Sequence, residues 1–124
     1  MHRSRLSTFV IDCRTADVEV AARFWSAALG RAARATPDDP LYRELEGEKE
    51  EPLLLVQKVE HESRIHLDIE ADDLEAEALR LEALGARRIG PVKRWIVMEA
   101  PTGQRFCIVR PQRGPLDESA NEWP

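Results

Sequence analysis

Cysteine is scarce in this sequence, since only Cys13 and Cys107 occur among its 124 residues. Both lie in predicted strands among apolar neighbours, so we expect two buried thiols in a reducing compartment and no disulfide framework. The N-terminal residues lack the apolar stretch of a signal peptide, and no apolar run reaches the roughly 20 residues that a membrane span needs. These absences predict a cytoplasmic protein with no membrane partner.

An excess of positive charge is also absent, because the formal net charge is -5. Binding to a phosphate backbone needs clustered Lys and Arg, so we expect no nucleic-acid partner. No Ser-His-Asp order, Gly-rich phosphate loop or Cys-x-x-Cys motif assigns an enzyme class. The chain has 43% hydrophobic residues. It is also long enough to bury a core as one domain.

One pattern of strand, cap and amphipathic helix occurs twice in the chain. Residues 65–69 alternate at period two, as a strand with one buried face does. Asp73 then stands at the start of a helix whose apolar stripe is stopped by Gly85. At one constant offset the equivalent pairs are Asp68 and Asp12, Asp73 and Asp17, Glu75 and Glu19, and His66 and Val10. Two copies in register predict a duplicated supersecondary unit, with Phe24, Trp25 and the helix leucines in the core.

The remaining periodic segments complete the order β-α-β-β-β in each copy. The predicted strands are 8–13, 31–35, 41–46, 53–59, 65–69, 87–93, 95–99 and 105–110. We therefore predict a single α+β domain over residues 1–111, with module one at about 8–59 and module two at about 64–111. Residues 1–7 are predicted to be a loose lead-in and residues 112–124 a tail, with Trp123 exposed or docked on a partner.

The phrases VIDCRTADVEVAARFWSAALG, HLDIEADDLEAEALRLEALGA and APTGQRFCIVRP, in this order, resemble glyoxalase-like members of the vicinal oxygen chelate superfamily. The resemblance implies two β-α-β-β-β modules that form an incomplete barrel around a concave cleft. Relatives include glyoxalase I, extradiol dioxygenases, fosfomycin-resistance transferases and metal-free bleomycin-binding proteins. The fold thus hosts both enzymes and plain binders, and family enzymes hold a divalent metal in the cleft.

The resemblance places one metal ligand at His66, whose counterpart in the first copy is Val10, which cannot bind a metal. It places Cys107 and Gln57 at the other ligand positions, and Asp12 and Asp68 lie on the same strand faces as Val10 and His66. Catalytic zinc and iron sites have three good protein ligands, so this ligand set is incomplete. Two structural alternatives stay open: Cys107 as a packing residue and the repeated aspartates as acceptors for loop N–H groups.

The resemblance also assigns strands to the walls of the cleft, where a mostly apolar pocket is expected with Arg105 fixing an anionic ligand. The expected lining residues are Tyr42, Leu53, Leu55, Trp95 and Met98. His61, in a charged linker, is expected to be solvated. A Cys107–His66 catalytic pair is a further alternative, since a thiolate needs a nearby base.

Three functions follow from this interpretation. The first is a small-molecule-binding protein without the full metal site and with no required cofactor. The second is a lyase, isomerase or dioxygenase that uses a divalent metal at His66. The third is an interaction module with a vestigial cleft. The expected partners are a small organic ligand and a second copy of the chain, because exposed strand edges favour a homodimer.

Overall fold

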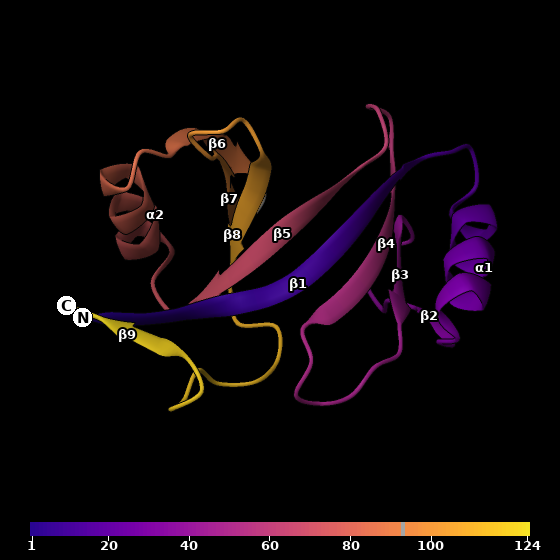
Figure 1. Ribbon diagram of the computed structural model, residues 1–124, viewed down its shortest axis with the longest axis horizontal. Coiled ribbons are helices and arrows are strands. Elements are labelled where there is room, and N and C mark those ends of the chain that lie inside the picture. Colours follow the sequence, from indigo (N-terminus) through magenta and orange to yellow (C-terminus); the bar gives the residue numbers. More distant parts are fainter. Residues whose placement is uncertain (93) are drawn as a thin grey trace. The chain divides into compact units, whose positions relative to one another are not determined.

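The computed structural model describes residues 1–92 and 94–124, so Lys93, predicted to end a strand, lies outside the described residues. This part of the chain contains two helices and nine strands, which makes an α+β fold. It divides into two compact units, residues 8–66 and residues 1–7 with 67–124. Two strands run from one unit into the other (Figure 1), and they are β1 (His2–Arg14) and β5 (Arg64–Ala71).

The first unit holds the first predicted module. After β1 its elements are α1 (Val18–Leu29), β2 (Ala33–Ala35), β3 (Tyr42–Leu45) and β4 (Leu53–Val59). The strand order is β2-β3-β4-β1, with β4 parallel to β1 and the other neighbours antiparallel. The module therefore has the predicted β-α-β-β-β order.

Helix α1 packs along β3 and β4 (Figure 1), and its buried face forms the core of this unit. Val18, Leu45 and Val56 are buried together there, with Cys13 and Trp25 partly buried beside them. The predicted cap is confirmed, because the Asp17 carboxylate accepts a hydrogen bond from the backbone N–H of Glu19. Gly30 ends the helix in the left-handed conformation at φ 67°, which a residue without a Cβ adopts easily.

The second unit holds the second module and repeats this arrangement. After β5 its elements are α2 (Leu74–Ala83), β6 (Arg87–Val92), β7 (Trp95–Glu99), β8 (Arg105–Val109) and β9 (Asn121–Trp123). The order is β5-β8-β7-β6, and β5 is parallel to β8 just as β1 is parallel to β4. Asp73 caps α2 through the Ala76 N–H. The predicted duplication is thus confirmed by equivalent strand positions and equivalent caps.

The predictions for both chain ends were wrong. Residues 2–7, expected to be a loose lead-in, are part of β1, and the expected tail ends in β9, which pairs antiparallel with β1. His2 lies opposite Trp123, so the two ends of the chain are side by side (Figure 1). Trp123 therefore docks on its own chain. Neither helix in the described part of the chain has the length and apolar character needed to cross a membrane.

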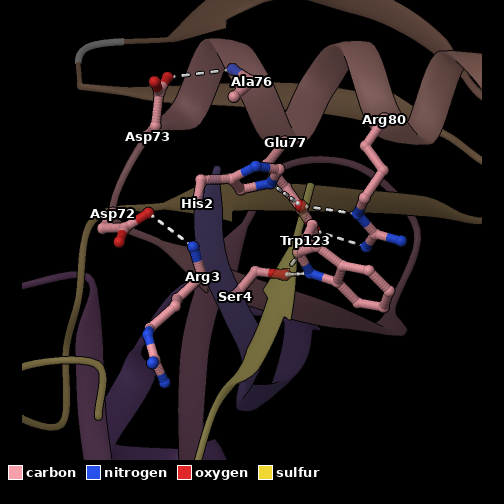
Figure 2. A network of polar contacts seen from close by, with 9 residues as sticks. All are labelled: His2, Arg3, Ser4, Asp72, Asp73, Ala76, Glu77, Arg80 and Trp123. Carbon is pink, nitrogen blue, oxygen red and sulfur yellow. Dashed lines mark hydrogen bonds and ion pairs between the residues drawn. The ribbon is translucent and has the colours of Figure 1, made fainter.

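A buried carboxylate under α2 holds these ends together (Figure 2). Glu77 has no exposed surface, and its oxygens accept hydrogen bonds from His2 Nε2 at 2.7 Å, Ser4 Oγ at 2.9 Å and the Arg80 guanidinium at 2.8 and 2.9 Å. The Trp123 Nε1–H donates to Ser4 Oγ, and the Arg80 guanidinium lies 3.8 Å from the centre of the Trp123 ring. The network thus joins the start of β1, helix α2 and β9.

The prediction that all large apolar residues of the helices are core was also wrong. Phe24 is 62% exposed and contacts Trp25 only edge to face, with ring centres 5.1 Å apart. Leu84 is 67% exposed. Each helix packs one face on its sheet, so the residues at the margin of the apolar stripe stay in solvent.

Candidate functional site

The face of the first unit that α1 leaves uncovered carries a row of polar side chains. Tyr42, Gln57 and Asp12 are register partners across β3, β4 and β1. Successive strand residues point to opposite faces, so this row lies opposite the face that Cys13 and Val56 present to α1. Asp12 and Gln57 thus share a face, as the sequence predicted.

Asp12 is the centre of this polar group. It is only 2% exposed, and its Oδ2 lies 2.7 Å from His66 Nδ1, 3.7 Å from Arg64 Nε and 3.9 Å from His61 Nε2. Only the His66 contact is short enough to be a hydrogen bond. One buried carboxylate therefore faces one arginine and two imidazoles.

The contact with Asp12 sets the hydrogen positions on His66. A carboxylate is an acceptor, so the Nδ1 atom of His66 carries a proton and donates it in a hydrogen bond to Asp12. The side chain of His66 is 14% exposed. Such a carboxylate–imidazole pair holds the ring in one orientation and makes Nε2 a stronger acceptor or metal ligand.

The second oxygen of Asp12 lacks a donor. Oδ1 is buried and accepts no hydrogen bond from any residue in the ranges 1–92 and 94–124. An unsatisfied buried carboxylate oxygen costs free energy, which native proteins usually avoid. The predicted alternative, in which Asp12 accepts loop N–H groups before the helix, does not describe this contact pattern.

The second unit presents its own polar row, on β5, β8 and β7. Asp68 is the register partner of Cys107, which pairs in turn with Val97. By strand alternation, Trp95 and Arg105 share this face. Arg105 Nε donates to Glu99 at 2.9 Å, and hydrogen bonds from Arg105 and Arg87 lower the pKa of the Glu99 carboxyl. Glu99 therefore balances the charge of Arg105, the cation expected to fix an anionic ligand.

Met98 is a correction to the predicted pocket lining. It is fully buried and packs with Ala71, Ala78 and Ile108 in the core beneath α2. Trp95 and Met98 are three residues apart in one strand, so their side chains point to opposite faces. The alternation in the sequence contained this information, and it excludes Met98 from the face of Asp68 and Cys107.

Potential metal ligands lie along β5 and its neighbour β8. His66, Asp68 and Cys107 offer an imidazole, a carboxylate and a thiol. His66 and Asp68 are two residues apart on one strand, and Cys107 is opposite Asp68. These donor types fit zinc. Val10, the counterpart of His66, is buried and has no ligand atom, so the donor set comes from β5 and β8.

The contacts of two residues with Asp12 were not predicted from the sequence. Arg64 lies two positions before His66 on β5, and period-two alternation alone could have placed it on the same face. His61 is exposed, as expected, with 43% of its side chain in solvent, but its Nε2 also lies 3.9 Å from Asp12 Oδ2. Its linker has no periodicity, so no local signal indicated this contact.

Comparison with known proteins gives a consistent result. The family model described as "Glyoxalase-like domain" matches residues 8–109, whereas no protein of curated function matches the sequence. The fold is similar to a glyoxalase/bleomycin resistance protein/dioxygenase superfamily member from Vibrio splendidus 12B01, with TM-score 0.55, 17% identity and coverage of 85% of this chain and 98% of the other.

Two further solved structures share the fold. The methylmalonyl-CoA epimerase from Mycobacterium tuberculosis has TM-score 0.54 and 19% identity, with 86% of this chain and 87% of the other covered. The Mn(II)-bound glyoxalase from Novosphingobium aromaticivorans has TM-score 0.59 and 14% identity, with 95% of this chain and 44% of the other covered. At these identities the similarity is one of fold.

Proposed function

Because this chain belongs to the glyoxalase-like domain family, we propose that it binds a small organic ligand at the polar group around Asp12 and His66. The observation that carries the proposal is the 2.7 Å contact from His66 Nδ1 to the buried Asp12 carboxylate. It orients one imidazole on a sheet face that α1 does not cover. Binding sites contain a few such oriented polar groups among apolar side chains.

The ligand in this proposal supplies hydrogen-bond donors. Asp12 Oδ1 is buried and accepts no hydrogen bond within the described residues. Ligands with a hydroxyl or amide group match this acceptor. Gln57, the register partner of Asp12, adds an amide that can both donate and accept.

A thermal-shift screen of small organic compounds tests this proposal, followed by titration calorimetry on each compound that raises the melting temperature. The variants are His66→Ala and, as a matched control in the same unit, Arg23→Gln on the exposed surface of α1. We expect His66→Ala to weaken binding about tenfold or more, because it removes the oriented polar group. Equal affinity of His66→Ala and wild type for every such compound would contradict the proposal.

The second candidate function is a metal-dependent lyase, isomerase or dioxygenase. The donors His66, Asp68 and Cys107 favour it, and a similar fold is that of a Mn(II)-bound glyoxalase. A metal held by these residues would polarise a ligand oxygen as a Lewis acid. Asp12 would then hold the ligating ring of His66, as carboxylates do behind metal-bound histidines.

Elemental analysis of protein purified without chelator separates the two candidates. The metal-dependent function predicts nearly one equivalent of a divalent metal in the wild type and a large loss in His66→Ala and Cys107→Ser. Sub-stoichiometric metal after incubation with zinc, nickel, manganese and ferrous iron would exclude it and leave ligand binding without a metal.

We further propose that two copies associate through strand edges. Strands β2 and β6 each have a single sheet neighbour in their unit, and all residues of β2 are exposed. An open edge presents unpaired backbone groups that a second chain can pair with. Light scattering coupled to size exclusion tests this proposal: a mass of twice 14.1 kDa supports the dimer, and a monomer mass at high concentration excludes it.

A further inference from the structure

Arg64 lies beside the Asp12–His66 hydrogen bond and takes no part in it. Its Nε atom is 3.7 Å from Asp12 Oδ2, a separation that is too long for a hydrogen bond, and its side chain is 48% exposed. In the part of the chain that the structure describes, no side chain accepts a hydrogen bond from the Arg64 guanidinium. A planar guanidinium carries five N–H donors, so both of its terminal nitrogens have donors to offer.

Within the described residues, Asp12 is the only carboxylate paired with Arg64, and the two make no hydrogen bond. Asp12 gives its short contact to His66, and His61 also points its Nε2 at the same oxygen from 3.9 Å. Glu62 lies two residues before Arg64 but forms no ion pair with it within the described residues, and Glu60 is bound to Lys58 at 3.1 Å. Asp12 thus gives its hydrogen bond to His66 and not to Arg64, so the guanidinium N–H groups of Arg64 can donate to an added anion.

The position of Arg64 aligns it with the ligand-binding group. Arg64 and His66 are two residues apart on β5, so their side chains share a strand face. The distances of both residues to the same Asp12 oxygen, 3.7 and 2.7 Å, support this shared face. A ligand that reaches His66 from this face passes the half-exposed guanidinium.

We infer that Arg64 binds a carboxylate or phosphate group of the ligand through its guanidinium fork. The inference rests on the proposed function and narrows it to small anionic compounds. Arginine matches two oxygens of a carboxylate or phosphate at once, and such charge-assisted pairs are the strong ones among hydrogen bonds. The buried Asp12 Oδ1, which has no donor within the described residues, adds an acceptor for a ligand that also carries a hydroxyl or amide group, whereas the anion itself binds Arg64.

Three related probes test the inference by titration calorimetry at low salt: benzoate, phenyl phosphate and neutral benzamide. We expect one of the two anions to bind about tenfold tighter than benzamide, since charge-assisted hydrogen bonds are roughly twice as strong as neutral ones. A preference for phenyl phosphate over benzoate assigns a phosphate ligand, and the reverse order assigns a carboxylate.

Variants of Arg64 separate recognition of the anion from general effects of charge. Arg64→Gln should remove the preference over benzamide, Arg64→Lys should keep only part of it because the fork is lost, and Arg23→Gln should leave it unchanged. The inference is overturned if Arg64→Gln keeps the preference, if benzamide binds the wild type as tightly as both anions, or if none of the probes binds.

The inference and the proposed function can fail separately. Binding of a neutral compound that depends on His66 but not on Arg64 overturns the anion subsite and leaves the ligand site in place. Binding that depends on neither residue overturns both. Circular dichroism of each Arg64 variant confirms that the fold is intact, and Arg64→Lys preserves the charge should Arg64→Gln prove unstable.

Discussion

Replacing Glu77 by Gln should destabilise the protein far more than a usual surface substitution. The Glu77 carboxylate is completely buried and accepts hydrogen bonds from His2, Ser4 and twice from Arg80. The Gln amide has one oxygen and one NH2 group. In Glu77→Gln the NH2 group would therefore replace the oxygen that accepts from His2 or the one that accepts from Ser4. Removing one partner of a buried ion pair costs about 3–5 kcal/mol. Because Arg80 keeps 25% of its side chain in solvent, we expect a loss of about 3 kcal/mol, at the low end of that range.

Urea denaturation followed by circular dichroism measures this loss as a free energy of unfolding. The matched control is Glu75→Gln in the same helix, where the carboxylate is 63% exposed and paired with Arg88. An exposed pair contributes little, so this control should leave stability almost unchanged. Equal free energies of unfolding for Glu77→Gln, Glu75→Gln and wild type would refute the reasoning.

The difference in free energy of unfolding between wild type and Glu77→Gln should change with pH in one direction. Burial opposes ionisation of Glu77, but hydrogen bonds from Arg80, His2 and Ser4 together lower the pKa of its carboxyl below the ordinary value. A lowered folded-state pKa gives stability that is present above the unfolded pKa of about 4.3 and is lost as the pH falls through the folded value. The advantage of wild type over Glu77→Gln should therefore be constant near neutral pH and shrink below about pH 4.

Three further predictions concern packing and reactivity. Met98→Ala should lower the free energy of unfolding by about 2–5 kcal/mol in urea titrations, because it leaves a cavity in the core; a loss under about 1 kcal/mol would argue against the core position. Trp123→Ala should cost about 2 kcal/mol, since it removes both the partly buried cation–π contact with Arg80 and the hydrogen bond to Ser4; wild-type stability would mean that β9 is not held by this ring. Burial raises the pKa of the Cys13 thiol, so mass spectrometry should show slower alkylation by iodoacetamide at pH 8 than for free cysteine; an equal or faster rate would contradict this.

The local signals in the sequence predicted most of the fold. Strands 53–59 and 95–99 were predicted with their observed bounds, and both aspartate caps were found. These features depend on residues close together in the chain, namely an alternating run or an acceptor before a helix. The constant offset between the two copies predicted equivalent strand positions for the same reason.

The features that the sequence did not predict depend on contacts between distant residues. The C-terminal end is polar, contains proline and has no periodicity of its own. It nevertheless forms β9, because it pairs with β1 and places Trp123 opposite His2. No local signal distinguishes Glu77 from a solvated helix residue, because its partner His2 is 75 positions away. The contact of His61 with Asp12 likewise follows from the fold of the linker. A cytoplasmic location stays a prediction of the sequence.

The most direct test of the central claim is a nitrogen NMR spectrum of the histidine side chains, recorded with and without a compound from the ligand screen. We predict that His66 carries a proton on Nδ1, that Asp12→Ala removes this preference, and that the Nε2 resonance shifts when the compound binds. A proton on Nε2 in the free protein, or an unchanged His66 spectrum at saturating compound, would contradict the proposal that Asp12 orients His66 to bind the ligand.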